Sequence, residues 1–129
     1  MRKLNNIRLM IDGEMYFRNL ADALEKAESE IFITDWWLCP KYFLVRPVSL
    51  LSKTDKEKYR LDCLLNKAAL RGVKIFIVHW QESRFAVTFN SLITKEYLTR
   101  LHPNIKMMRH TSDGISLWSH HAKMVIIDQ

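Results

Sequence analysis

The residues best suited to chemistry stand near the end of the chain, where His121 and Lys123 are followed by Asp128. On an extended strand, residues two apart share a face and lie roughly 6.6 Å apart along the chain. An imidazole and an ammonium group placed in this way can act on one phosphate group, the ring as a nucleophile and the lysine as a fixed cation. The apolar, β-branched run between Lys123 and Asp128, residues 124–127, is typical of a buried strand.

The sequence around this pattern resembles a known family. The segments that carry the resemblance are residues 31–40 (IFITDWWLCP), 59–62 (YRLD), 71–77 (RGVKIFI), 101–105 (LHPNI) and 118–129 (WSHHAKMVIIDQ). With them, the chain from about Ile7 to Gln129 resembles the N-terminal catalytic half of a eukaryotic phosphatidylcholine-type phospholipase D. That family belongs to the phosphodiesterase superfamily marked by the His-x-Lys-x4-Asp (HKD) motif.

The resemblance implies a role for each residue of the motif. His121 would attack phosphorus and form a phosphohistidine intermediate, and Lys123 would neutralise the non-bridging oxygens in place of metal ions, so we expect neither a metal nor a cofactor. Asp128 would orient a catalytic histidine through a carboxylate–imidazole hydrogen bond. The general acid would come from a second copy of the motif, but none of the other four histidines has a lysine two residues later.

We therefore expect residues 1–129 to form a single catalytic half-domain with one HKD motif, a fragment of a longer two-motif chain. The second half would come from the same parent chain or from a homodimer. The implied substrate is a phospholipid, phosphatidylcholine, at a membrane surface, and the implied regulators of the parent are phosphoinositide and a small GTPase. Two alternatives stay open: an HKD phosphodiesterase acting on nucleic acid or another phospholipid, and an inactive fragment that binds anions or membranes.

Five further residues are candidates for binding the substrate. Trp118 stands three residues before His121, where it could form a wall of the site. His120 directly precedes His121, where a supporting or structural role is favoured over that of a second nucleophile. Trp36 could line an opening for headgroup or acyl chain, although strands also bury large aromatic residues. Asp35 stands toward the end of one predicted strand and Glu82 follows another, where carboxylates could attract a choline ammonium, but simple solvation at the surface is an equal alternative for both.

Composition favours an ordinary globular domain with anionic partners. Of 129 residues, 48% are hydrophobic and 26% charged, and 20 Lys and Arg against 14 Asp and Glu give a net charge of +6. This charge suits lipid headgroups or nucleic acid without choosing between them. Cys39 and Cys63 show no metal-ligand spacing or disulfide framework. Since no apolar run approaches the length of a membrane span and no signal peptide is evident, we expect a cytoplasmic, peripherally membrane-associated protein with no transmembrane segment.

The positions of apolar residues predict strands that alternate with helices. A strand at 7–11 would end at the Asp12-Gly13 turn, and apolar residues from Phe17 to Ala27 recur at helical spacing. The further predicted elements are strands at 31–37, 73–78, 105–108 and 124–127, helices at 61–68 and about 91–101, and loops at 38–58 and 110–115. Gly72 would end the second helix. This order predicts an α/β fold with α-β-α layers around a mixed, largely parallel sheet.

Overall fold

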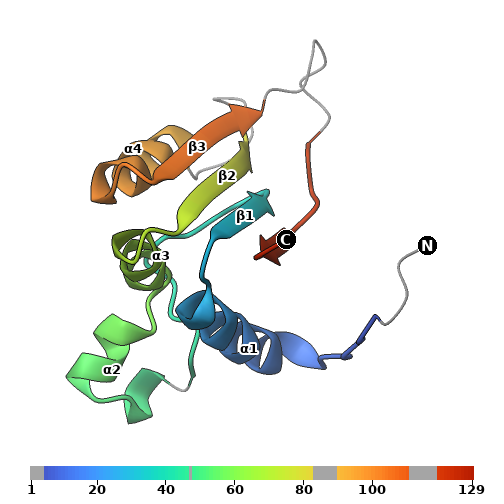
Figure 1. The fold of residues 1–129 in the computed structure, drawn as a ribbon, viewed down its shortest axis with the longest axis vertical. Coiled ribbons are helices and arrows are strands. Elements are labelled where there is room, and N and C mark those ends of the chain that lie inside the picture. The colour runs from blue at the N-terminus through green and yellow to red at the C-terminus, as the bar shows by residue number, and fades with distance from the viewer. Residues whose placement is uncertain (1–4, 47, 83–89, 111–118) are drawn as a thin grey trace.

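The computed structural model describes residues 5–46, 48–82, 90–110 and 119–129 (Figure 1). Its elements are α1 (Asp12–Lys26), β1 (Glu30–Asp35), η1 (Val48–Leu50), α2 (Lys53–Lys58), α3 (Leu61–Leu70), β2 (Lys74–Trp80), α4 (Ser91–Leu101), β3 (Ile105–His110) and β4 (Met124–Ile127). Helices and strands alternate through most of this order, as the apolar periodicity predicted.

The four strands form one sheet in the order β3-β2-β1-β4. β1 pairs in parallel with β2, and β2 with β3, so that Ile31, Ile75 and Ile105 stand side by side. β4 is antiparallel to β1, with Ile127 opposite Ile31. The predicted mixed, largely parallel sheet is thus confirmed. Because β4 runs in the opposite direction, its first residues lie at the same edge as the ends of β1, β2 and β3.

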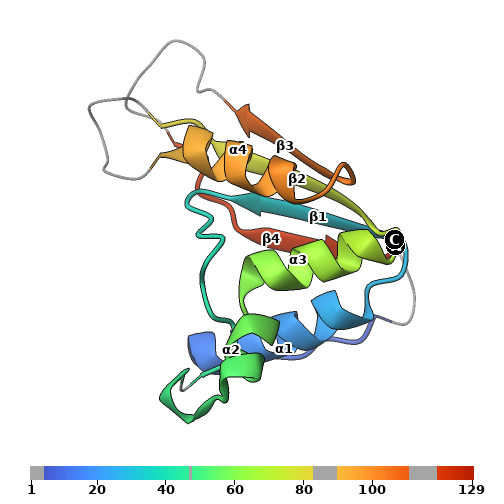
Figure 2. The same ribbon diagram turned by 90° about the vertical axis from the view of Figure 1, so that its left-hand side faces the viewer.

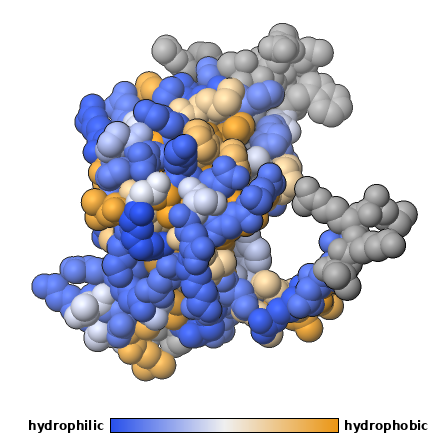
Figure 3. Space-filling model, viewed as in Figure 1, coloured by the Kyte–Doolittle hydropathy of each residue, from blue (hydrophilic) through white to orange (hydrophobic). Residues whose placement is uncertain are grey.

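One face of the sheet carries the hydrophobic core. Alternate residues of the strands, such as Ile33, Ile77 and Met107, are buried there against α3, α4 and α1 (Figures 1 and 2). The α/β class is confirmed. Two helix layers were expected, and among the described residues α1, α3 and α4 form the layer on this face of the sheet. Phe76 and Met108 on the opposite face are 37% and 55% exposed. Figure 3 shows apolar side chains there between hydrophilic ones.

The start of α1 differs from the prediction. Residues 7–11 belong to no strand of the described sheet, and Ile7, Leu9 and Ile11 are exposed on a segment that projects from the body (Figure 3). Asp12 lies inside α1 with a φ of 64°, and its carboxylate accepts the backbone N–H groups of Glu14 and Met15. Its side chain thus satisfies the first free N–H groups of the helix, so Asp12 starts a helix where a turn was expected.

The predicted loop at 38–58 also contains structure. Its polar end forms α2, because the hydroxyl of Ser52 accepts the backbone N–H of Asp55 and donates to the Asp55 carboxylate. Ser52 is therefore the N-cap of α2, and the acidic residue three positions later holds the serine hydroxyl in place. The predicted loop at 110–115 begins at His110, the last residue of β3, and its other residues lie outside the described part of the chain.

Gly72 stands just after α3, as predicted. Its φ of 101° lies in the left-handed region that favours glycine, and its N–H donates to the carbonyl of Ala69. The chain can therefore turn directly from α3 into β2. Within the described residues, none of the helices combines the length and the apolar character needed to cross a membrane.

Candidate active site

The candidate site lies at the edge of the sheet where the parallel strands end. β1 ends at Asp35 and β2 at Trp80, while Thr34 of β1 stands opposite Met124, the first residue of β4. The segment that precedes β4 therefore runs past the ends of β1 and β2 (Figure 1). Ligands of α/β proteins bind at this carboxyl edge, where side chains from several strands converge.

His121 and Lys123 are in contact on the exposed surface of this segment. The ammonium Nζ of Lys123 is 2.7 Å from Nδ1 and 3.3 Å from Nε2 of the His121 ring, and it also donates to the carbonyl oxygen of His121 at 2.8 Å. An ammonium group can only donate, so the ring nitrogen at 2.7 Å accepts, which suits a neutral imidazole. The two side chains that the spacing predicted to share a face thus lie together and are open to a ligand.

Trp36 lies beside this pair. Its ring centroid is 5.1 Å from that of His121, and the Lys123 ammonium lies 5.7 Å from the centroid of the same indole. Trp36 in turn stacks on Trp80, with 5.7 Å between ring centroids and an interplanar angle of 13°. Trp36 therefore supports the His-Lys pair from the sheet side, with the buried Trp80 behind it.

The sequence analysis did not name Trp80 as a site residue. The signal was present, because β1 and β2 pair Asp35 with His79, and each of these is followed by a tryptophan. Residues at matching positions on neighbouring parallel strands stand side by side, so a correct register would have predicted the stack. His79 is itself buried, and its Nε2 accepts the backbone N–H of Leu38, which holds the turn after Trp36.

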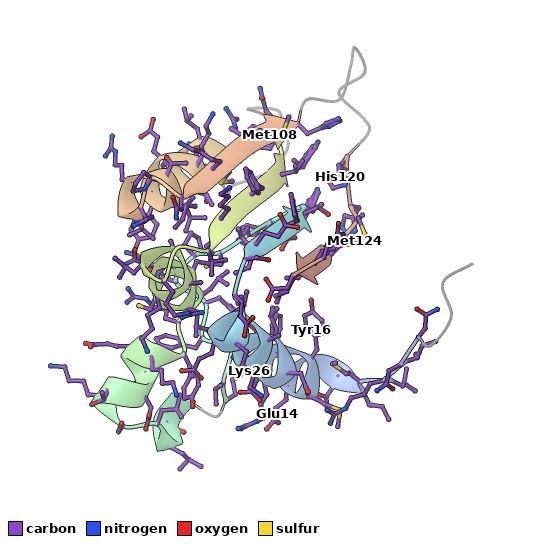
Figure 4. All side chains as sticks on the ribbon, viewed as in Figure 1. Glu14, Tyr16, Lys26, Met108, His120 and Met124 are labelled. Atoms are coloured by element: carbon purple, nitrogen blue, oxygen red, sulfur yellow. The ribbon has the colours of Figure 1, made fainter. Side chains whose placement is uncertain are left out.

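His120 and Trp118 were the candidates nearest to the motif. His120 is half-buried on the segment that leads into β4 (Figure 4), and its ring centroid lies 6.1 Å from that of His110. Its Nδ1 is buried and has no hydrogen-bond partner among the described residues. Trp118 lies outside the described residues, so its expected place in a wall of the site stays a prediction.

The two candidate carboxylates lie in different surroundings. Asp35 accepts the backbone N–H of Trp37 and lines the same cavity as Lys123. Glu82 accepts the N–H of Ser91 at 2.9 Å and lies 3.9 Å from the Arg109 guanidinium, which ties it to α4 and β3. Burial raises the pKa of Glu82, but its hydrogen bonds, with Arg109, outweigh burial and leave the pKa below its ordinary value. Asp35 thus shares the cavity with Lys123, whereas Glu82 is held by α4 and β3.

Asp128 lies at the opposite edge of the sheet. Its carboxylate accepts the backbone N–H groups of Ser29, Glu28 and Glu30 at 2.8 to 3.1 Å, and the Ser29 hydroxyl at 2.9 Å. These groups hold its pKa well below the usual range. Seven residues of extended chain separate Asp128 from His121, roughly 23 Å. Asp128 therefore joins β4 to the start of β1, and its expected bond to a catalytic histidine, such as one of a second motif, stays a prediction.

A cavity of about 580 Å³ opens beside the pair, between α1 and the strands β1 and β4. Its walls are almost entirely apolar, and Lys123 lies at its polar side with Asp35 and Tyr16. Burial, and to a lesser degree the charge of Asp35, raises the pKa of the Tyr16 hydroxyl. Figure 4 shows Tyr16 pointing from α1 toward β4 and Met124 on the opposite rim. Among the described residues, no cluster of three His, Cys, Asp or Glu side chains could hold a metal ion.

Comparison with known proteins finds close relatives for nearly the whole chain. It is 49% identical over 122 residues to human phospholipase D1, 46% over 121 residues to phospholipase D zeta 2 of Arabidopsis thaliana, and 44% over 124 residues to phospholipase D A of Dictyostelium discoideum. These alignments cover 92 to 96% of this chain and 9 to 11% of the relatives, so the chain spans about a tenth of their length. No protein-family model matches the sequence.

Proposed function

This chain is a phospholipase D-like sequence of the eukaryotic type, and from that premise we propose that it supplies the first of two HKD motifs of a phospholipase D. The reaction is hydrolysis of phosphatidylcholine to phosphatidic acid and choline. Residues 1–129 form one catalytic half-domain in this proposal, and the second half comes from the same longer protein or from a second copy of the chain.

The observation that carries the proposal is the contact between His121 and Lys123 at an accessible edge of the sheet. A phosphodiester bound there would receive the imidazole at phosphorus and the ammonium at its non-bridging oxygens. The indole of Trp36 restricts the positions of the His121 ring and the Lys123 ammonium, so that these side chains lose little conformational entropy when the substrate binds.

In the proposed first step, a ring nitrogen of His121 forms a bond to phosphorus while the phosphorus–oxygen bond to choline breaks. The leaving alkoxide takes a proton from a histidine of the second motif, which acts as the general acid. Water then attacks phosphorus and gives a proton to the histidine of the second motif, while the phosphorus–nitrogen bond breaks; phosphatidic acid leaves, and both histidines return to their starting state. Lys123 is the cation that this chain brings to the phosphate, and Asp128 keeps β4 and the motif fixed to the sheet.

The remaining candidates surround this reaction. Asp35 offers an anion near the pair for a choline ammonium, and His120 lies next to the nucleophile with an unpaired ring nitrogen among the described residues. We propose peripheral binding to a membrane, since a net charge of +6 is attracted to anionic lipid. We also propose that a phosphoinositide and a small GTPase regulate the longer protein.

The test is choline release from phosphatidylcholine vesicles by the protein that joins this chain to a second motif. We expect His121→Asn to lower the rate at least about a thousandfold, because it removes the nucleophile. His110→Asn, a histidine at the same edge of the sheet, is the matched control and keeps its rate within a small factor. Cleavage of DNA without choline release would contradict the proposal and favour a nuclease; release of neither product would leave an anion-binding module.

A further inference from the structure

The cavity beside Lys123 has the character of a site for an alkyl chain. Its most buried lining residues are Leu24, Ile33 and Leu44, which are at most 4% exposed. Leu20 of α1 and Val125 of β4 continue these walls toward the opening. Its volume of about 580 Å³ lies within the usual range for small-molecule sites, roughly 300 to 1,000 Å³.

The cavity is continuous with the candidate active site. Lys123 lines the cavity and contacts the His121 ring at 2.7 Å. Among the polar groups in its lining, Thr34 and Asp35 lie at the end of β1 and Tyr16 lies in the second turn of α1, whereas the most buried lining residues are leucine and isoleucine. An anion held by Lys123 would therefore have an apolar cavity directly on one side of it.

We propose that this cavity binds an acyl chain of the lipid whose phosphate is held by Lys123 and His121. The inference rests on the proposed function, and it assigns the glycerol side of the diester to the cavity between α1 and β4. The choline group would then lie outside the cavity, near Asp35 at the end of β1, and would leave toward solvent, while the phosphatidyl group stays attached to His121 with its chain buried. The competing occupant is an apolar strand or loop of polypeptide, and the dependence of affinity on alkyl chain length distinguishes the two.

The test measures binding of hexyl, octyl and decyl phosphate to the chain, each below the concentration at which it forms micelles. A buried methylene strengthens binding about fourfold, so the dissociation constant falls by that factor per methylene until the cavity is filled. Leu20→Trp narrows the cavity and removes most of this dependence, while its affinity for inorganic phosphate is unchanged. The matched control is Leu92→Trp, on the exposed side of α4.

A second measurement needs no substitution. An alkyl phosphate with a nitroxide at the end of its chain should broaden the methyl NMR signals of Leu24 and Val125 more strongly than those of Leu98 and Ile105, which are buried elsewhere in the core. Affinity that does not change with chain length, or broadening that is strongest at Met108 on the open sheet face, would overturn the inference and favour a polypeptide segment as the occupant of the cavity.

The two proposals fail in different ways. Affinity that depends on chain length, together with no choline release by the two-motif protein, would support the alkyl-binding cavity and contradict the proposed phospholipase activity. Choline release that requires His121, together with affinity that does not depend on chain length, would support the proposed activity and contradict the proposed acyl site.

Discussion

At the residue scale, Asp128 accepts four hydrogen bonds at the start of β1, and its negative charge therefore contributes to the stability of the folded chain. The backbone N–H groups hold its pKa below the ordinary value of 3.8. A carboxylate whose pKa is lower in the folded than in the unfolded chain stabilises the fold at neutral pH. That stabilisation is complete above about pH 5 and is lost as the pH falls below the unfolded value toward the folded one.

We predict that Asp128→Asn lowers the urea midpoint of unfolding at about pH 7, and that the difference from the wild-type chain shrinks as the pH falls below about 4. Asparagine also tolerates the left-handed conformation of this residue, with a φ of 51°, so the substitution tests the charge. Urea titrations followed by circular dichroism measure both effects. Asp22→Asn, at an exposed position of α1, is the control; an equal midpoint for Asp128→Asn and wild type at neutral pH would contradict the account.

Residues differ in how far their roles could be predicted from the sequence. The contact of His121 with Lys123 depends on two positions of one extended segment, so the spacing was enough. The partners of Asp128 stand 98 to 100 residues earlier in the chain. Nothing in the local pattern identifies them, because only the antiparallel register of β4 on β1 brings them together.

At the element scale, a buried ionic group joins α3 to α4. Asp62, in the first turn of α3, is 2% exposed; it accepts two hydrogen bonds from Arg60 and one from the hydroxyl of Tyr97 on α4. Burial raises the pKa of Asp62, but these hydrogen bonds outweigh burial, and the pKa lies below its ordinary value. The two helices are thus held at a fixed position under the sheet.

We predict that Tyr97→Phe lowers the free energy of unfolding by about 1 to 3 kcal/mol, because a buried carboxylate oxygen loses a donor while the ring is retained. The Lys41 ammonium, 5.6 Å from the centroid of the Tyr97 ring, keeps its aromatic partner. Chemical denaturation measures the change, with Tyr42→Phe as the control on the ring that packs against Phe17. Equal losses in the two variants would show that the Asp62 bond contributes nothing.

The elements that the sequence predicted well are those with a strong apolar period. β1, β2 and β3 and the helices α1, α3 and α4 follow that period to within a few residues. α2 has no apolar stripe, and its start depends on the Ser52–Asp55 cap, a signal that composition alone hides. Ile7–Ile11 shows the opposite case, since its alternation predicted a strand that pairs with none of the described strands.

At the scale of the whole molecule, the direction of β4 decides the site. If β4 were parallel to β1, the segment with His121 and Lys123 would lie at the opposite edge of the sheet, away from Trp36 and Trp80. The antiparallel pairing of Thr34 with Met124 brings the motif to the carboxyl edge, beside the apolar cavity. The sequence predicted a mixed sheet but not which strand was reversed, because strand direction depends on pairing between distant segments.

The central claim is that His121 is the nucleophile, and an activated diester tests it most directly. A p-nitrophenyl phosphodiester has a weakly basic leaving group that needs no general acid, so this chain should react with it without a second motif. We predict a burst of about one equivalent of nitrophenolate per chain and a phosphoryl adduct that mass spectrometry maps to His121, with neither in His121→Asn. An adduct on another residue, or a burst that survives His121→Asn, would contradict the account.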